Sequence, residues 1–151
     1  MNRNDENRSL KSSFSYALKG LIEIYKSQRN FRIQSLIGLL VLIVAIFADL
    51  TEVEFILLIF TVMLVLIMET VNTVTEKLLD FLHPFYSSSV KIIKDVSAAA
   101  VFITSIFAVA VGIIIFGDAF FNLSPQYGII LAIVFLLFLN LCGFIYKNRE
   151  K

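Results

Sequence analysis

The chain has 151 residues, 58% of them hydrophobic, and a mean hydropathy of +0.86. Between its apolar runs there is no room for a soluble domain, so we expect one small integral membrane protein. The single cysteine excludes an internal disulfide. The net charge of +1 says little by itself, and no nucleic-acid partner is expected.

The basic residues are confined to three parts of the chain. All 13 Lys and Arg lie before residue 35, between residues 77 and 94, or after residue 146. The connections 49–54 and 117–126 contain acidic residues and no Lys or Arg. Because cytoplasmic loops are enriched in Lys and Arg, we expect a cytoplasmic-membrane protein with both termini in the cytoplasm.

Residues 1–9 are polar and predicted to be a disordered tail. Apolar residues then recur at helical spacing opposite Lys, Ser and Glu, at Leu10, Phe14, Leu18, Leu21 and Tyr25. This pattern predicts an amphipathic helix lying in the inner membrane surface, with its lysines facing anionic headgroups. Packing of the same helix against neighbouring helices is the alternative, and both can hold at once.

Four apolar segments follow, each long enough to cross a membrane. The first three are 31–48, a run from about residue 53 onward, and 95–116, with a turn around Pro84 before the third. The fourth, 127–146, is followed by basic residues. The predicted fold class is therefore an all-α membrane protein with an N-terminal interfacial helix, three spans and an extra fourth C-terminal span.

The second span carries four polar residues on one face. Glu69, Asn72, Glu76 and Asp80 are spaced 3, 4 and 4 residues apart, which places them within a sector of roughly 60°. No turn signal precedes Glu69, so one helix is expected to continue through it. Counting about 1.5 Å per residue from Glu54, Glu69 lies about 22 Å and Glu76 about 33 Å from the outer edge of a hydrocarbon layer roughly 30 Å thick. Glu69 is thus expected at lipid depth and Glu76 among the inner headgroups.

An ionisable residue inside a span is costly and indicates function, although polar residues that join helices across a bundle are the alternative. Lys94 and Asp95 add charge at the inner start of the third span: Lys94 can hold phosphate, and Asp95 can bind a metal or orient Asn72 or Lys94. An ion pair that anchors the span is the competing interpretation. The combination suits phosphoryl transfer, with Glu69 as base and Glu76 as Mg²⁺ ligand. His83 and Cys142 are assigned no role.

Four segments resemble the prokaryotic diacylglycerol kinase and undecaprenol kinase family. They are Tyr16-Ala17-Leu18-Lys19-Gly20-Leu21, Asn30-Phe31-Arg32, Glu69-x-x-Asn72-x-x-x-Glu76-x-x-x-Asp80, and Lys94-Asp95-x-x-Ala98-Ala99-Ala100-Val101. The resemblance covers about residues 10–116, which it implies are the membrane lipid kinase domain; residues 117–151 add an outer loop, the fourth helix and a basic tail. It implies a bacterial homotrimeric lipid kinase that uses ATP and Mg²⁺, with active sites shared between subunits.

The resemblance also implies a role for individual residues. It implies that Glu69, as general base, and Asn72 are catalytic, and that Glu76 and Gln28 bind the metal ion. It implies that the lipid substrate is bound by Glu69, Arg32 and Ala98. The residues that it implies bind the nucleotide are Tyr16, Gln28, Glu76, Tyr86, Lys94 and Asp95, and Asp80 has a supporting role.

The chain departs from the family pattern at three places. Gln28 stands where the family usually has a second metal-binding glutamate; its amide oxygen can coordinate Mg²⁺ but brings no charge. Phe85-Tyr86-Ser87 replaces the usual Glu-Tyr-His of the inner loop, and many members lack the fourth span.

Four functions stay open at this point. Phosphorylation of undecaprenol, which recycles the carrier lipid of cell-wall synthesis, is the leading hypothesis, and phosphorylation of diacylglycerol is the close alternative. A membrane scaffold weakened in catalysis at Gln28 is the third. A small channel or transporter is the fourth, and it is disfavoured because the polar residues lie near the inner face rather than at the midplane.

Overall fold

The computed structural model describes the backbone of residues 10–149 and the side chains of residues 12–145. The predicted tail 1–9, the side chain of Leu10 and the side chains of the basic C-terminal tail lie outside these described residues. The elements are five α-helices: α1 (Leu10–Ser27), α2 (Arg29–Ile46), α3 (Glu52–Leu82), α4 (Ser88–Phe121) and α5 (Gln126–Arg149). Four of them, α2 to α5, are long and apolar enough to cross a membrane. The predicted fold class is confirmed.

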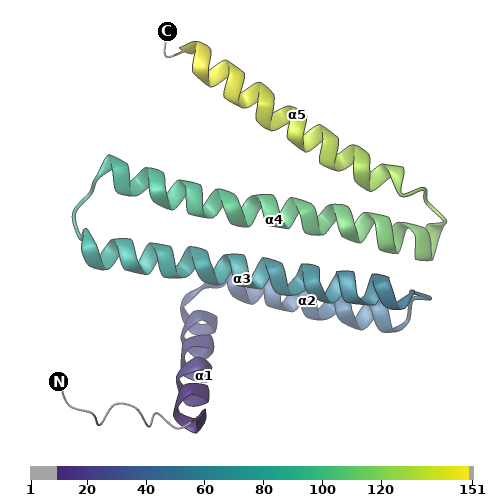
Figure 1. Ribbon diagram of the computed structural model, residues 1–151, viewed down its shortest axis with the longest axis horizontal. Coiled ribbons are helices and arrows are strands. Elements are labelled where there is room, and N and C mark those ends of the chain that lie inside the picture. Colours follow the sequence, from purple (N-terminus) through teal and green to yellow (C-terminus); the bar gives the residue numbers. More distant parts are fainter. Residues whose placement is uncertain (1–9, 150–151) are drawn as a thin grey trace.

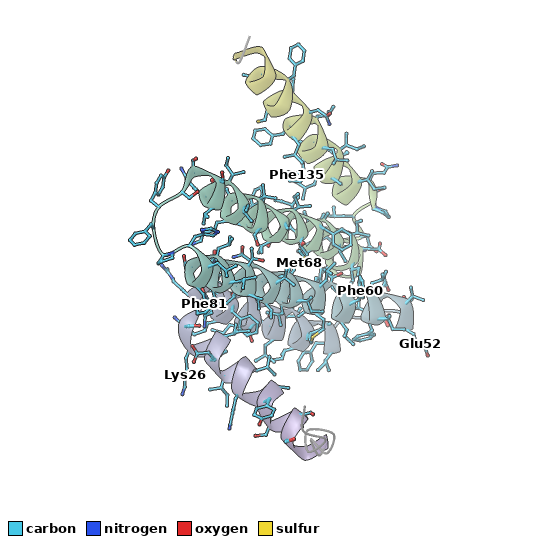
Figure 2. All side chains as sticks on the ribbon, turned by 60° about the vertical axis from the view of Figure 1, so that its left-hand side comes forward. Lys26, Glu52, Phe60, Met68, Phe81 and Phe135 are labelled. Atoms are coloured by element: carbon cyan, nitrogen blue, oxygen red, sulfur yellow. The ribbon has the colours of Figure 1, made fainter. Side chains whose placement is uncertain are left out.

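The helix α3 continues through Glu69 without interruption for 31 residues, as the absence of a turn signal predicted. Its start is fixed by a capping box, in which the Thr51 hydroxyl accepts from the Glu54 N–H and the Glu54 carboxylate accepts from the Thr51 N–H. The two exchanged bonds satisfy backbone groups that a helix end leaves free. Figure 2 follows the helix from Glu52 at one end past Phe60 and Met68 to Phe81 at the other.

The helix α1 runs across the direction of α2, α3 and α4, at the end where α3 meets α4 (Figure 1). The chain turns from α1 into α2 at Gln28, whose backbone is extended. Across this corner, the Arg32 guanidinium donates to the carbonyls of Tyr25 and Lys26 at the end of α1. The apolar face of α1 stays uncovered by the chain, and Phe14 is 67% exposed. An uncovered apolar face on a crosswise helix is what the interfacial prediction requires.

The helices α2, α3 and α4 pack side by side. Gly38 allows α2 to approach α3 closely, since a Cβ at that position would lie 2.6 Å from the Cγ1 atom of Val62. Toward the end of the bundle away from the turn between α3 and α4, Ala45, Leu58 and Ile115 form a buried core contributed by the three helices. The third span extends beyond its predicted limits of 95–116 at both ends, because α4 starts directly after the Pro84 turn and stops only at Asn122, a residue in the left-handed conformation.

The fourth span, α5, contacts α4 near the loop that joins them and diverges from it toward the C-terminus (Figure 1). Gly128 lies against α4: a Cβ there would clash with Ile114 and lie 2.8 Å from the Ala110 carbonyl oxygen. Further along, the rings of Phe102 and Phe135 meet edge to face at 5.8 Å. Gly128 and the pair of Phe102 and Phe135 are therefore two of the places where α5 packs closely on α4.

We expect Gly128→Ala to lower the free energy of unfolding by about 1–3 kcal/mol, because the added methyl group overpacks a contact with helix backbone. Gly143→Ala on the same helix is the matched control: nothing lies within 4 Å of its added Cβ, so stability should be unchanged or slightly higher. Thermal unfolding in detergent measures both. Equal melting temperatures for the two variants would contradict the packing of α5 on α4.

Candidate active site

The polar face of α3 passes from the protein interior to solvent along the helix. Glu69 is 2% exposed and Asn72 is 7% exposed, whereas Glu76 is partly buried and Asp80 is exposed. This order follows from the direction of the helix, since each step of three or four residues moves about one turn toward the inner end. The structure thus places the carboxylate expected at lipid depth inside the protein and the last two toward the polar end of α3, next to the turn before α4.

Glu69 lies next to a residue that sequence analysis missed. The Gln34 amide on α2 donates from Nε2 to Glu69 Oε2 at 3.5 Å, which is long for a hydrogen bond. Its signal in the sequence was a polar residue between the buried residues Phe31 and Gly38, at helical spacing on the face of α2 turned toward α3. That face is recognisable only once the partner helix is known.

Asn72 and Glu76 form the next layer of the site. Asn72 Nδ2 donates to Glu76 Oε1 at 3.1 Å, so the amide orients the carboxylate. The Asn72 Oδ1 atom is buried and has no hydrogen-bond partner among the described residues. A carboxylate beside an unpaired amide oxygen suits Mg²⁺, which takes one or two protein oxygens and leaves the rest to phosphates and water. Within the described residues no three His, Cys, Asp or Glu side chains gather to hold a metal ion.

Lys94 pairs with Asp80, which ties α4 to the end of α3. The sequence had suggested Asp95 as a partner of Lys94 or Asn72; in the structure Asp95 is exposed and the lysine turns to Asp80 instead. Both partners are accessible to solvent. Such a pair contributes little to stability, so a phosphate group can exchange for the aspartate at low cost.

A polar cavity of about 300 Å³ lies at the turn between α3 and α4. It is lined by Asp80, His83, Pro84, Phe85, Tyr86, Ser87, Val90, Lys91 and Lys94. Two lysines therefore face one space, together with the predicted nucleotide residue Tyr86. His83, to which sequence analysis gave no role, lines the same cavity.

A second cavity, of about 320 Å³ and almost wholly apolar, opens between α2, α3 and α4. Gln34 lines it, and so does Val65, one turn before Glu69 on α3. Val41, Val109 and Phe116 extend it toward the outer side. Along α3, Glu69 thus lies between the level of an apolar cavity, lined by Val65, and the polar groups Asn72 and Glu76.

The other predicted site residues are spread over α1, α2 and α4. Tyr16 is exposed on α1, with the Lys19 ammonium 5.9 Å from its ring centre, and Gln28 forms the corner between α1 and α2. Arg32 donates a hydrogen bond to the Tyr25 carbonyl at the end of α1, and Ala98 is exposed on α4. Within the described side chains, Gln28 makes no hydrogen bond to Glu76.

Fold and site together define a multi-pass membrane protein in which α3 carries a buried carboxylate, Glu69, between the apolar cavity and the lysine-lined cavity at its end. The sequence profile of the family described as prokaryotic diacylglycerol kinase matches residues 15–116. The chain belongs to that family. The matched region covers most of α1 and reaches Phe116 in α4, so α5 lies outside it.

Three relatives carry kinase names. A diacylglycerol kinase of Synechocystis is 38% identical over 101 residues, which are 66% of this chain and 58% of the relative, less than two thirds of its own length. An undecaprenol kinase of Bacillus subtilis is 28% identical over 76% of this chain and 92% of the relative. A diacylglycerol kinase of Escherichia coli is 34% identical over 62% of this chain and 77% of the relative.

At the level of the family, these matches confirm the resemblance and the prediction of a lipid kinase in a membrane. The relatives are named for two different lipids at modest identity, so the names leave the lipid undecided.

We expect Asp80→Asn to change the free energy of unfolding by less than about 1 kcal/mol, because its ion pair with Lys94 is accessible to solvent. The control is Asp118→Asn, an exposed carboxylate at the opposite end of α4. Thermal unfolding at low and high salt measures both variants. A loss of several kcal/mol for Asp80→Asn alone would show that the pair is a structural tie rather than an exchangeable one.

Proposed function

We propose that the chain is an ATP-dependent kinase of a membrane lipid alcohol, with undecaprenol as the first candidate and diacylglycerol as the second. The observation that carries the proposal is the position of Glu69 on α3: it is buried, one turn from Val65 of the apolar cavity in one direction, and followed in the other direction by Asn72, Glu76 and, three turns on, Asp80 of the lysine-lined cavity. A lipid kinase needs such a junction, since its acceptor is dissolved in hydrocarbon and its donor in water.

On the lipid side, the apolar cavity offers room for part of a prenyl or acyl chain, with the hydroxyl near Glu69. Glu69 takes the hydroxyl proton as general base. The alcohol oxygen then bonds to the γ-phosphorus of ATP, the bond from that phosphorus to the β,γ-bridging oxygen breaks, and ADP leaves. Arg32 and Ala98 are further candidates for contacts with the lipid.

On the aqueous side, the ion pair of Lys94 with Asp80 breaks and Lys94 binds the phosphates of the nucleotide instead. Lys91 and Tyr86 line the same cavity. Glu76 and Asn72 Oδ1 are the groups that would hold Mg²⁺, with Gln28 from the helix corner. The bound ion would neutralise charge on the transferring phosphates. Asn72 keeps the Glu76 carboxylate turned toward that position.

The arrangement of charges supports a cytoplasmic-membrane location with both termini in the cytoplasm. Figures 1 and 2 place Lys26 of α1 toward the end where α3 meets α4, the end that carries Lys77, Lys91 and Lys94. The opposite end carries Glu52 and Asp118. Basic residues on one side and acidic residues on the other follow the positive-inside rule.

A homotrimer with shared active sites is part of the proposal. Gln28 and Asp95 form no side-chain hydrogen bond or ion pair within the described residues of one chain, although both are candidates for the site. The spans α2, α3 and α4 also expose large apolar side chains along their length. A neighbouring copy that packs against these spans can bring the missing groups to Glu76.

Two other functions are carried as alternatives. A scaffold that has lost catalysis through Gln28 keeps the same fold and predicts no phosphate transfer. A channel needs polar groups near the midplane, whereas the cavity in the outer half of the bundle is apolar. The apolar cavity favours the kinase.

We expect Glu69→Gln to lower the rate of phosphate transfer from labelled ATP at least a hundredfold, because it removes the base. Transfer to undecaprenol and to diacylglycerol is measured in mixed micelles, and the faster reaction identifies the substrate. Glu52→Gln, at the outer end of the same helix, is the matched control and should keep its rate. Unchanged transfer in Glu69→Gln would remove Glu69 from the mechanism.

Gln28→Glu should lower the Mg²⁺ concentration needed for half-maximal activity, because a carboxylate adds charge to the site. The Mg²⁺ dependence of transfer is measured for wild type, Gln28→Glu and the control Gln126→Glu on α5. Transfer that appears only in Gln28→Glu would favour the scaffold alternative for the natural chain. An unchanged Mg²⁺ dependence would place residue 28 outside the metal site.

A further inference from the structure

The helix α5 carries one amide side chain inside its apolar stretch. From Gly128 to Ile145 every residue except Asn140 is apolar, and the window Gln126–Ile145 has a mean hydropathy of 2.8. Counting about 1.5 Å per residue from Gln126, Asn140 lies about 21 Å along the helix, within a hydrocarbon layer roughly 30 Å thick. Asn140 is exposed, so no other described helix covers a polar group that lies at lipid depth.

The amide of Asn140 is only partly satisfied. Its Nδ2 donates to the Leu136 carbonyl, one turn earlier on the same helix, at 2.8 Å. An amide side chain has two N–H donors and a carbonyl oxygen, so one donor and Oδ1 are left without a partner among the described residues. Hydrocarbon offers no hydrogen bonds to either group. A helix that supplies both a donor and an acceptor at the same depth would satisfy them.

Asn140 belongs to a regular face of α5, which we call the Asn140 face. Its members are spaced 4, 3, 4 and 3 residues apart, and all are exposed: Ile129, Ile133, Leu136, Asn140 and Gly143. Gly128 and Phe135, which contact α4, lie about 100° away around the helix. Beyond Phe135 the helix diverges from α4 (Figure 1), so the Asn140 face is left open by the packing of the chain.

This spacing is that of a coiled-coil seam, with apolar residues alternating every three and four positions. Ile133 and Asn140 are seven residues apart and occupy one kind of seam position, whereas Leu136 occupies the other. A β-branched residue at the first kind and Leu at the second favour two parallel strands, and one Asn at the first kind fixes their register. Copies of one membrane protein insert with the same orientation, so two of them present this face in parallel.

We propose that the Asn140 face is an interaction surface for α5 of a second copy of the chain. The two helices form a parallel pair, and the two Asn140 amides, at equal depth, donate to and accept from each other. The inference does not depend on the proposed activity, since α5 lies outside the residues 15–116 matched by the family profile. A two-fold contact relates only two copies, so it is separate from the proposed trimer and would join one trimer to another.

Disulfide cross-linking in lipid bilayers tests the pair, with copper phenanthroline as oxidant and Cys142→Ala as background. Leu136→Cys should cross-link almost completely, because each cysteine of a pair faces one partner. Phe138→Cys is the matched control: the two side chains are 57% and 56% exposed, and Phe138 lies on the opposite side of the helix. It should remain monomeric under the same conditions, and dilution with lipid should leave the difference intact.

Equal cross-linking of the two cysteine variants, or none for Leu136→Cys, would overturn the proposal. Cross-linking that stops at about two thirds of the chains would also overturn it, because a ring of three leaves one cysteine unpaired. Both variants keep Asn140, so this comparison does not depend on whether changes of Asn140 are tolerated.

The role of the amide is tested in the Leu136→Cys background. Asn140→Leu should slow cross-linking about tenfold, because it removes the hydrogen bonds between the helices. Asn140→Gln should restore most of the rate, since it has the same donors and acceptor. An unchanged rate in Asn140→Leu would remove the amide from the interface. The variants Asn140→Leu and Asn140→Gln should have the same melting temperature in dilute detergent, where the copies are separated.

Discussion

The burial of a carboxylate near the end of an apolar helix is the constraint on which the rest of the structure depends. Glu69 follows a run of apolar residues that starts at Phe55, and burying a carboxylate among lipid chains is costly unless polar groups lie next to it. The fold supplies polar neighbours from two directions. Gln34 approaches from α2, and α3 itself continues inward to Asn72 and Glu76.

We propose that the same helix connects two solvents. One turn before Glu69, Val65 lines an apolar cavity; in the other direction follow Asn72, Glu76 and, three turns on, Asp80 of the lysine-lined cavity. The crosswise helix α1 and the turn around Pro84 lie at this inner end (Figure 1). Acceptor and donor can therefore meet without either leaving its own phase, and this is the physical basis of the proposed reaction.

Local periodicity was enough to predict the helices and the common face of Glu69, Asn72 and Glu76, whereas the interfacial position of α1 stays a prediction. These depend on spacing within one segment, which a sequence displays directly. The contact of Gln34 with Glu69 and the pair between Asp80 and Lys94 were not predicted. Both depend on how separate helices approach each other, and for Gln34 on the absence of a side chain at Gly38.

The roles of the predicted site residues stay predictions. For Gln28 the reason is structural: its side chain makes no hydrogen bond to Glu76 within the described residues, and we propose that its role depends on how copies of the chain assemble. No spacing within one sequence reveals that arrangement.

The central claim is that α3 crosses from hydrocarbon to water between Glu69 and Glu76. Nitroxide labels at the exposed positions Phe60, Val71 and Lys77, in a Cys142→Ala background in lipid bilayers, report this depth without touching the site. Their relaxation by oxygen and by a water-soluble nickel complex is compared. The account predicts that oxygen dominates at Phe60 and still exceeds the nickel complex at Val71, and that the nickel complex dominates at Lys77. Dominance of the nickel complex at Val71 would put Glu69 in water, and dominance of oxygen at Lys77 would put Glu76 in lipid; either result would contradict the account.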